Sequence, residues 1–452
     1  MTVDYKETVF LPKTTFSMRG NLTEKEPLFL KRWEEEKLYQ KMEEARQGRP
    51  LFTLHDGPPY ANGHIHVGTG LNKILKDVIN RTKHMQNYRI NFVPGWDCHG
   101  LPIEWKIEEK YRAEGKKKED VPLIQFRQEC RDFAAYWLNI QREEFKRLGI
   151  YGRWDKPYVT MDFEAEARIV ETLAQFLMNG GLYKGEKPVL WSVVEQTALA
   201  EAEVEYKDIT SPSIYVAFPF IKSSCPALEA VEGLIWTTTP WTIPGNRAIA
   251  YGPDISYIVL EIKATHSGSL ARSGQKILIA EDLVEQVVQA NGISDYQIKA
   301  HITAADLKGA ICAHPFRAQG YDFEVPLLPG SHVTTQTGTG LVHTAPGHGE
   351  DDFKLGQEFG LEIPRMIADD GTYYDHVPLF AGQHVYKVAP MICEVLKETG
   401  ALLSQNTYLH SYPHSWRSKA PLIFRVTPQW FISLTQNALR EKMLATIEDV
   451  QW

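Results

Sequence analysis

The sequence predicts an α/β fold in which a Rossmann-type parallel sheet is interrupted by an inserted β-rich domain. A strand, a helix and a second strand follow one another within residues 51–93, which is the order of a βαβ unit with a parallel sheet. From Tyr206 to about residue 400 the chain changes to short alternating strands separated by Gly, Pro and Thr turns. Around Tyr408 the earlier character returns. A single sheet split by an insertion explains this order.

Length and composition favour a multidomain cytoplasmic protein. The chain has 452 residues and a formal net charge of -8, so we expect about three folding units and no nonspecific coating of nucleic acid. No apolar run is long enough for a membrane span. The five cysteines are widely spaced without a CxxC pair, which favours reduced thiols over a disulfide framework.

The elements of the first part are predicted in chain order. Apolar residues at helical spacing predict a helix over 27–48 and a second helix containing the stripe from Val67 to Ile79. Short apolar runs predict strands over 51–54 and 90–93. Two further helices follow, one ending at Gly149 and one at Gly180. The predicted domains are an amino-terminal extension and packing helix (1–50), the first half of the Rossmann-type catalytic domain (51–205), the insertion (206–405), and a truncated return into the catalytic domain (406–452).

Three alternating segments carry the β-rich prediction, and the return is predicted from two further segments. The strands are expected at Ser213–Phe218, Tyr257–Ile262 and Gln297–Ile302. Pro421–Phe424 is expected to be a strand that rejoins the first sheet, and Asn437–Glu448 an amphipathic helix. Because the sequence stops at Trp452 without a closing element, we expect a truncated protein.

Two loops lie at the edge of the sheet where α/β folds bind ligands. The loop Asp56–Gly68 follows the first strand, and Gly95–Gly100 follows the second. A helix amino terminus attracts phosphate, and a histidine there, at His64 or His66, can donate to phosphate oxygens. Neither a GxGxxG nor a GxxxxGK[ST] motif occurs, which disfavours dinucleotide binding and P-loop hydrolysis.

Each of these residues also has a simpler explanation. A histidine beside a glycine is most often a solvated turn. Asp97 alone would serve as a cap for the helix beginning near Ile103, and Cys98 as a small buried residue. The functional interpretation depends on the coincidence of both loops at one edge of one βαβ unit.

The motifs resemble those of the isoleucine enzymes among the bacterial-type class I aminoacyl-tRNA synthetases. The runs that carry the resemblance are Asp56–Thr69, its continuation Asn72–Asp77, Pro94–Glu104, and the amino-terminal Leu11–Thr14 with Met18–Leu22. The valine and leucine relatives differ in these loops. The resemblance implies an amino-terminal fragment of an enzyme that activates L-isoleucine with ATP and Mg²⁺, transfers it to tRNA(Ile), and hydrolyses mischarged valine.

The resemblance also assigns roles to residues of the two loops. Gly57, Pro58 and Tyr60 would shape the amino-acid pocket, and Asp97 would bind the α-amino group. His64, His66, Gly68 and Thr69 would face ATP, with the last three as the catalytic signature. The family signature has a histidine where this chain has Thr69, and a threonine cannot be cationic. We therefore expect weaker stabilisation of the leaving pyrophosphate than the full signature would provide.

Two segments of the insertion resemble the walls of the hydrolytic editing pocket in these synthetases. They are Trp236–Asn246 and Gly338–Phe353. Alone, a threonine run more often marks a strand edge, and a His and Asp pair is more often structural. The resemblance implies that Asp352 holds the amino group of the mischarged residue, and that Thr237, Thr238, Thr239 and His343 contact substrate and position water. An apolar pocket rejects a substrate one methylene smaller by only ~1–3 kcal/mol, a magnitude long known from isoleucine against valine in enzymes of this kind.

The resemblance bears on metal, partners and rival functions as well. Many relatives bind zinc with two CxxC pairs at the insertion's junctions, but this chain has Ser192-Val193-Val194-Glu195 and Ser415-Trp416-Arg417-Ser418, so no metal is expected. We expect a monomer without membrane association. By the resemblance, this chain would lack the family's lysine-rich ATP loop and its anticodon-binding region. A stand-alone deacylase of mischarged tRNA and a nucleotide-binding regulatory module are the alternatives. The first loop would be unnecessary in a pure deacylase.

Overall fold

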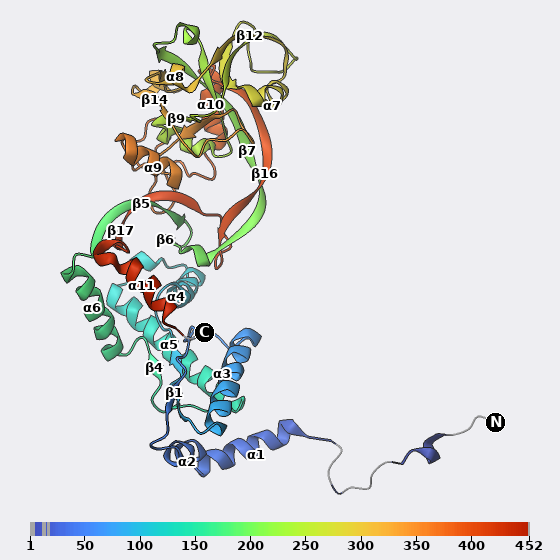
Figure 1. Cartoon of the computed structure of the whole chain (residues 1–452), viewed down its shortest axis with the longest axis vertical. Coiled ribbons are helices and arrows are strands. Elements are labelled where there is room, and N and C mark those ends of the chain that lie inside the picture. Colours follow the sequence, from blue (N-terminus) through green and yellow to red (C-terminus); the bar gives the residue numbers. More distant parts are fainter. Residues whose placement is uncertain (1–4, 11–14, 16–18, 451–452) are drawn as a thin grey trace. The chain divides into compact units, whose positions relative to one another are not determined.

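The computed structural model describes residues 5–10, 15 and 19–450, which form two compact units (Figure 1). We call Met1–Asn179 the amino-terminal unit and Gly180–Trp452 the carboxyl-terminal unit. Residues 180–205 and 406–452, which the sequence assigns to the Rossmann-type part, fold in the same compact unit as the predicted insertion. Most of the amino-terminal motif, Leu11–Thr14 and Met18, lies outside the described residues.

The amino-terminal unit contains the predicted βαβ arrangement. Strands β1 and β2 pair in parallel, with Phe52 opposite Ile90, and helix α3 connects them. The helix predicted over 27–48 is two helices, because Lys37 between them has a φ of 52°. The elements are η1 Tyr5–Thr8, α1 Leu22–Glu35, α2 Leu38–Ala45, β1 Leu51–Thr53, α3 Val67–Met85, β2 Arg89–Asn91, β3 Gly95–Trp96, α4 Leu101–Ala113, η2 Lys118–Asp120, α5 Leu123–Arg147, β4 Tyr158–Val159 and α6 Phe163–Met178.

Helix ends in this unit follow the predicted glycine signals. Gly149 follows the last turn of α5 with a φ of 77°, and Gly180 follows α6 with a φ of 78°. A left-handed residue just past a helix is most easily provided by glycine, which has no Cβ. Among the described residues, no helix has both the length and the apolar character needed to cross a membrane.

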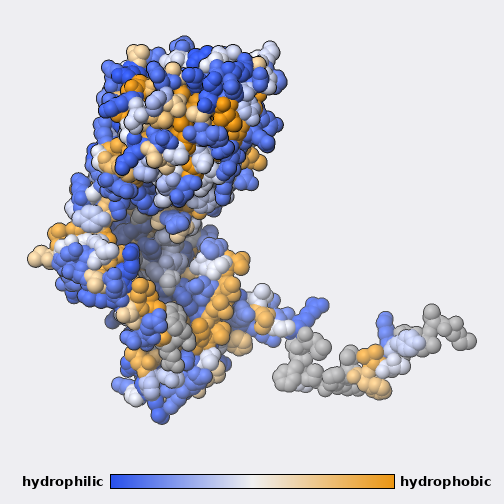
Figure 2. All heavy atoms as spheres, turned by 45° about the horizontal axis from the view of Figure 1, so that its top comes forward, coloured by the Kyte–Doolittle hydropathy of each residue, from blue (hydrophilic) through white to orange (hydrophobic). Residues whose placement is uncertain are grey.

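Helix α3 packs its polar side inward. Its buried residues include Lys73, Asp77 and Asn80, whereas the apolar stripe is solvent exposed at Leu75 (53%) and Val78 (54%). Figure 2 shows exposed apolar surface of this kind in orange. Salt bridges inside the unit, described below, compensate the buried charges. The helix is therefore amphipathic as predicted, but its apolar face is the more exposed one.

The carboxyl-terminal unit is built around a ten-stranded sheet, as the β-rich prediction requires. Nine strands follow the order β12-β10-β11-β8-β7-β13-β14-β9-β15, and β16 pairs with β7. The described strands are β5 Leu182–Ser192, β6 Thr197–Ala198, β7 Val204–Lys222, β8 Glu232–Thr237, β9 Ala248–Tyr251, β10 Tyr257–Thr265, β11 Lys276–Ala280, β12 Ile293–Ile302, β13 Ile311–Ala313, β14 Glu324–Pro329, β15 Leu341–Thr344, β16 Leu402–Ser415 and β17 Ile423–Ile432.

Short helices lie between these strands and after the last of them. They are η3 Glu201–Glu203, η4 Pro226–Leu228, η5 Pro240–Gly245, η6 Glu281–Leu283, α7 Val284–Ala290, α8 Ala304–Leu307, η7 Arg317–Gln319, α9 Glu350–Phe359, α10 Ala389–Glu398, η8 Gln436–Ala438 and α11 Leu439–Glu448. The predicted helix over 437–448 corresponds to η8 and α11. Its first residue, Asn437, has a φ of 56° and interrupts it.

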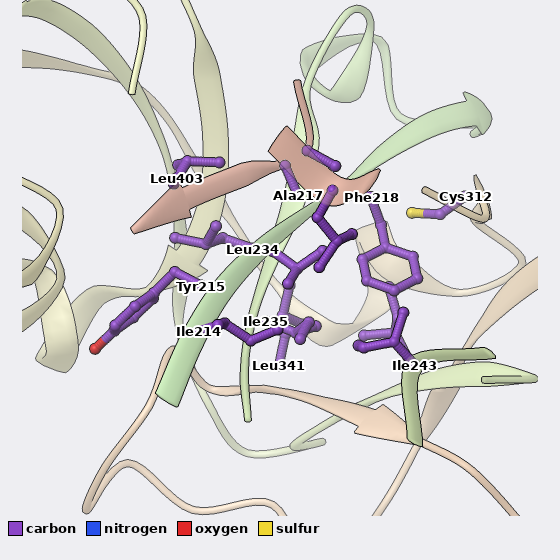
Figure 3. Close-up of a cluster of buried hydrophobic side chains, with 14 of the residues drawn as sticks. Ile214, Tyr215, Ala217, Phe218, Leu234, Ile235, Ile243, Cys312, Leu341 and Leu403 are labelled. Atoms are coloured by element: carbon purple, nitrogen blue, oxygen red, sulfur yellow. The ribbon is translucent and has the colours of Figure 1, made fainter. Parts of the chain in front are cut away.

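The core of this unit lies between the central strands. Ile214, Phe218, Leu234 and Ile235 are completely buried, and Figure 3 shows them converging from neighbouring strands with Leu341. Burying a Leu, Ile or Phe side chain stabilises a fold by about 1.5–3 kcal/mol. The long strand β7, which carries Ile214 and Phe218, therefore contributes strongly to the stability of this core.

Two antiparallel ladders carry the chain into and out of the sheet. Strands β7 and β16 run side by side as a long ribbon in Figure 1, from Val204 opposite Ser415 to Val216 opposite Leu402. Strand β17 pairs with β5, and β6 completes a three-stranded sheet. A strand thus begins within the predicted segment Pro421–Phe424, but it pairs with β5 and not with β1 or β2, so the predicted return to the first sheet is wrong in its partner.

Candidate functional site

The two predicted ligand loops of the amino-terminal unit are joined through their backbones. The amide of Asp97 donates to the carbonyl of Pro59 at 2.9 Å, and the amide of Ala61 donates to the carbonyl of Asp97 at 3.1 Å. Tyr60 and Asp97 consequently form a parallel bridge. Gly95 permits this approach, since a Cβ there would lie 3.2 Å from the Cβ of Pro58. The structure thus brings Pro58 and Tyr60 beside Asp97.

Helix α5 holds the first loop with two side chains that the sequence analysis missed. Buried Gln141 donates through Nε2 to the carbonyls of Tyr60 at 3.0 Å and Gly63 at 2.7 Å, and its Oε1 accepts from the Trp96 indole at 3.0 Å. One turn later, Glu144 Oε2 accepts from the amide of Ile65 at 3.0 Å. A polar residue on the apolar face of a predicted helix is the signal that would have found Gln141.

The histidines of the first loop have different surroundings. Exposed His64 lies with Nδ1 2.5 Å from Glu144 Oε1. His66 is the N-cap of α3, and its Nδ1 accepts from the amide of Thr69 at 3.3 Å. A Cβ at Gly68 would lie 3.0 Å from His66 Cε1. Because Nδ1 acts as acceptor, the neutral ring of His66 carries its proton on Nε2, which is the atom able to donate to a ligand.

A buried ion-pair network fixes the start of this loop. Asp56, which is 3% exposed, pairs with Lys73 of α3, which is 1% exposed. Its carboxylate also pairs with Lys76 Nζ at 2.7 Å and accepts from the amide of Gly95 at 2.9 Å. Burial lowers the pKa of Lys73, and the Asp56 charge opposes that effect. These contacts tie the end of β1 to α3 and β3.

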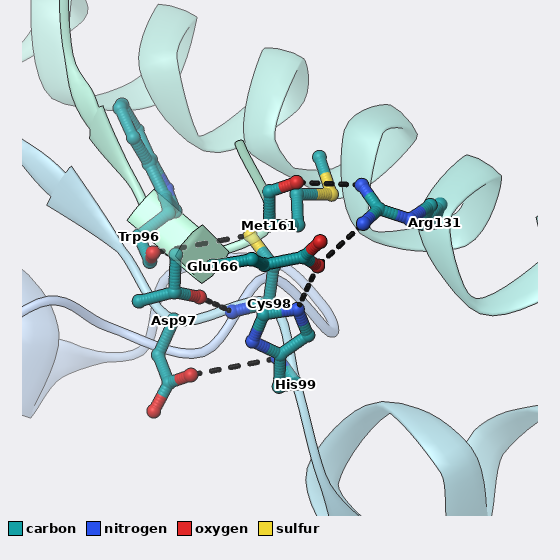
Figure 4. Close-up of polar contacts among 8 residues, drawn as sticks. Trp96, Asp97, Cys98, His99, Arg131, Met161 and Glu166 are labelled. Atoms are coloured by element: carbon teal, nitrogen blue, oxygen red, sulfur yellow. Dashed lines mark hydrogen bonds and ion pairs between the residues drawn. The ribbon is translucent and has the colours of Figure 1, made fainter. Parts of the chain in front are cut away.

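The second loop is held by residues of α5 and α6 (Figure 4). His99 Nε2 lies 2.9 Å from Glu166 Oε1, and Glu166 also pairs with Arg131. Although partial burial raises the pKa of Glu166, hydrogen bonds from His99 and Arg131 lower it below its ordinary value. Burial, and then the charge of Asp97, raises the pKa of the Cys98 thiol to about 11. Cys98 is therefore a small buried residue, which is the simpler explanation given for it above.

The Asp97 carboxylate is left without a cationic partner. It is half-buried, and its Oδ1 accepts only a long hydrogen bond of 3.5 Å from the amide of His99. No lysine, arginine or histidine among the described residues lies within ion-pair distance of it. A carboxylate in this setting is suited to an incoming cation, because the ligand would supply the missing charge. Gly57, Pro58 and Tyr60 lie in the adjoining loop, with Gly57 and Tyr60 exposed.

A second polar cluster lies in the carboxyl-terminal unit, where β8 runs into η5. The hydroxyls of Thr237 and Thr239 are 3.1 Å apart, and the amide of Thr239 donates to Thr237 Oγ1 at 3.1 Å. The hydroxyl of Thr242, which the sequence analysis did not single out, lies 3.4 Å from that of Thr239. Thr238 is half-buried, without a side-chain hydrogen bond in the described part. Three of the four hydroxyls thus form one chain.

His343 on β15 joins this chain. Its Nε2 lies 3.0 Å from Thr242 Oγ1, and its Nδ1 lies 2.8 Å from Asn246 Nδ2. Asn246 Nδ2 also donates to the carbonyl of Ala248 at 2.9 Å, which fixes the orientation of that amide. His343 Nδ1 therefore accepts, and Nε2 carries the proton and donates to Thr242. Burial lowers the pKa of His343 to about 3, so it is neutral at physiological pH.

Asp352 lies in the first turn of α9, near the end of the strand that carries His343. Its Oδ2 accepts from the amide of Ala345 at 2.8 Å. Burial raises the pKa of Asp352 to about 7, although that hydrogen bond lowers it and the charge of Asp351 raises it further. The described hydrogen bonds do not connect Asp352 to the threonine chain. Its link to His343 is the backbone between residues 343 and 345.

The described residues contain no group of three or more His, Cys, Asp or Glu side chains placed to hold a metal ion. All five cysteines are unpaired thiols.

Comparison with known proteins places this fold in a defined class. The family described as "tRNA synthetases class I (I, L, M and V)" matches residues 28–452. The chain belongs to that family of class I tRNA synthetases. Its structure is the mixed α/β fold of the class with a β-rich insertion.

Among curated relatives, the similarity is to isoleucine enzymes. Isoleucine--tRNA ligase of Gluconobacter oxydans is 54% identical over 461 residues, covering 99% of this chain and 48% of the relative. The same enzyme of Pelagibacter ubique is 50% identical, covering 99% and 49%. The chain thus spans about half the length of these relatives. A solved structure, "The crystal structure of GlLeuRS-CP1", matches 44% of this chain at 15% identity with a TM-score of 0.34.

Proposed function

We propose that the chain carries the amino-acid and ATP half-site of an isoleucine-tRNA ligase in its amino-terminal unit. The observation that carries this proposal is the backbone bridge between Tyr60 and Asp97, which sets a carboxylate without a cationic partner beside the Gly57–Tyr60 loop. A substrate ammonium would pair with Asp97, while Gly57, Pro58 and Tyr60 would shape the pocket for the side chain.

The ATP side of this site is proposed at the start of α3. His64, His66, Gly68 and Thr69 lie in or beside its first turn, where the helix dipole and backbone amides favour phosphate. His66 would donate through Nε2 to the leaving pyrophosphate, with Mg²⁺ as the expected companion of ATP. Thr69 offers its hydroxyl where the family signature has a histidine, so its assistance would be limited to one neutral hydrogen bond.

We propose an editing site for mischarged valine in the carboxyl-terminal unit, within the insertion predicted at 206–405. The hydroxyl chain of Thr237, Thr239 and Thr242 ends at a neutral His343 whose proton points toward Thr242. Such a histidine cannot act as a strong acid, and it would orient hydroxyls around the ester and an attacking water. Thr238 would contact substrate, and Asp352 would receive the ammonium of the valyl group.

The proposed partners follow from these two sites. They are L-isoleucine, ATP and tRNA(Ile), bound by a monomer in the cytoplasm. Zinc is not proposed, because the junction positions carry serines and one glutamate, which suit zinc poorly beside thiolates. A deacylase that only clears mischarged tRNA would need the second site and not the first.

Binding of a nonhydrolysable isoleucyl-adenylate mimic tests the first site. Titration calorimetry should detect weak binding to the chain, and Asp97→Asn should weaken it at least tenfold, since a charge-assisted hydrogen bond contributes about 1.5–3 kcal/mol. Asp132→Asn, which changes an exposed carboxylate of the same unit, should leave binding unchanged. Equal binding by the Asp97 variant, or no binding at millimolar mimic, would contradict the proposal and favour the deacylase.

Hydrolysis of valyl-tRNA(Ile) by the chain tests the second site. Asp352→Ala should slow deacylation by about one to two decades through loss of the ammonium's partner, while binding of the adenylate mimic stays unchanged. The neighbouring exposed Asp351→Ala is the matched control. If Asp352→Ala hydrolyses the ester at the normal rate, or if the unmodified chain does not hydrolyse it, the editing assignment is wrong.

A further inference from the structure

The two junctions of the insertion meet in the carboxyl-terminal unit, at four positions where the family resemblance places zinc-binding cysteines. The residues present are Ser192, the last residue of β5, with Glu195 just after it, and Ser415, the last residue of β16, with Ser418 just after it. Three hydroxyls and one carboxylate do not fit the thiolate chemistry of a structural zinc site. The side chains nevertheless gather at one place, and Ser192, Glu195 and Ser415 are 0%, 6% and 0% exposed.

Glu195 is the centre of the contacts at this place. Its Oε1 accepts from the hydroxyl of Ser415 at 2.8 Å and from the amide of Ser418 at 3.1 Å. Its own amide donates to Ser192 Oγ at 3.2 Å. Residues more than two hundred positions apart in the sequence are therefore joined through one side chain.

The two turns are also closed locally. Ser415 Oγ accepts from the amide of Arg417 at 3.2 Å, and Ser418 Oγ accepts from the amide of Ala420 at 3.3 Å. Each serine thereby folds its turn so that the chain presents the Ser415 hydroxyl and the Ser418 amide to Glu195.

We propose that these four residues form a metal-free clasp in which Glu195 Oε1 takes the central position that a metal ion would occupy. The clasp closes a corner of the fold. Ser415 ends the β7–β16 ladder opposite Val204, and Ser192 ends β5 next to Trp191, which pairs with Ile423 at the start of β17. The clasp therefore fixes the ladder that leads into the proposed editing site against the sheet formed by β5, β6 and β17.

The clasp depends on one of the two oxygens of the Glu195 carboxylate, Oε1, which makes both of its contacts. Glu195 Oε2 is buried without a hydrogen-bond partner among the described atoms. Removing the whole side chain would leave the Ser415 hydroxyl and the Ser418 amide unpaired as well, and unpaired buried donors are costly. Glutamine keeps an acceptor of the same length and should preserve most of the clasp.

Thermal unfolding of the carboxyl-terminal unit tests the central role of Glu195. Glu195→Ala should lower its Tm by about 5 °C or more, and Glu195→Gln by less than half of that shift. The control is Glu205→Ala, which removes an exposed carboxylate paired with Lys419 at 2.7 Å on the same corner, and it should change the Tm by about 1 °C or less. Equal shifts for Glu195→Ala and Glu205→Ala would overturn the proposal.

A metal-binding variant tests whether the four positions converge. S192C/E195C/S415C/S418C should bind one zinc per chain and should give the thiolate absorption bands of tetrahedral Co²⁺ when loaded with cobalt. The matched variant S192C/E195A/S415C/S418C supplies one thiolate fewer and should bind zinc at least tenfold more weakly. A folded four-cysteine variant that binds no zinc, or one zinc per chain in the unmodified protein, would refute the metal-free clasp.

Discussion

Replacing Lys73 by methionine should destabilise the amino-terminal unit more than any single change on the apolar face of α3. The side chain of Lys73 is 1% exposed and pairs with that of Asp56, which is 2% exposed. Methionine has a similar length without the charge, so the substitution leaves Asp56 buried with only Lys76 and the Gly95 amide. Removing one partner of a buried ion pair typically costs about 3–5 kcal/mol.

The remaining contacts of Asp56 place the expected loss near the lower limit. A cost of about 3 kcal/mol corresponds to a fall in Tm of roughly 6–12 °C for a unit of this size. The assay is calorimetric or fluorescence-monitored unfolding of the chain, with the transition of the amino-terminal unit followed separately. The double variant Asp56→Asn with Lys73→Met should recover part of the loss, because replacing both partners removes the orphaned charge.

The neighbouring residue Ile74 provides the control. It is 41% exposed on the apolar side, so Ile74→Gln should change the unfolding free energy by about 0.5 kcal/mol or less. If Ile74→Gln costs more than Lys73→Met, then α3 buries its apolar side and the inverted packing described above is wrong.

Three further outcomes follow from single contacts. Gln141→Leu should lower the free energy of unfolding by about 2–4 kcal/mol in denaturant titration, since it leaves two carbonyls and an indole unpaired, whereas exposed Glu143→Leu should not. Gly340→Ala places a Cβ 2.3 Å from another Cβ at a φ of 77°, and it should reduce the Tm far more than Gly382→Ala, where φ is 72° but nothing lies within 4 Å. Asp352 has a folded pKa of about 7, above its ordinary 3.8, so its stabilising contribution is complete below about pH 3.8 and is lost as the pH rises through 7. Unfolding at pH 4–8 should therefore show that Asp352→Asn removes this decline.

Much of the fold could be predicted from local patterns. Strand β1, helix α3 and strand β2 follow directly from apolar periodicity, and Gly149 and Gly180 end helices because a left-handed residue is needed there. The break at Lys37 was not predicted, since lysine gives no signal of a positive φ. The pairing partner of β17 could not be predicted from local sequence patterns either, because strand pairing depends on long-range packing and not on the composition of the strand.

The candidate site was predictable in its loops but not in what holds them. Asp97 and the Gly57–Tyr60 loop were expected at one edge, and the backbone bridge brings them together. Gln141 is marked only by being a polar residue on the apolar face of a helix, and the partners of Gln141 and Thr242 include residues far away in the sequence. The burial of Lys73 could not be predicted from the sequence either, since a lysine in a helix is normally solvated.

The two clusters differ in how each would meet an ammonium. Asp97 is half-buried and has no cationic partner among the described residues. Asp352 has a pKa of about 7, so near neutral pH a large fraction of it is protonated before any substrate arrives. An ammonium entering beside Asp352 supplies the missing counter-charge, lowers that pKa, and releases a proton as it binds. Recognition at Asp352 is therefore coupled to pH in a way that geometry alone does not reveal. The described contacts of Asp352 lie within the carboxyl-terminal unit, so this coupling to pH is a property of the second cluster itself.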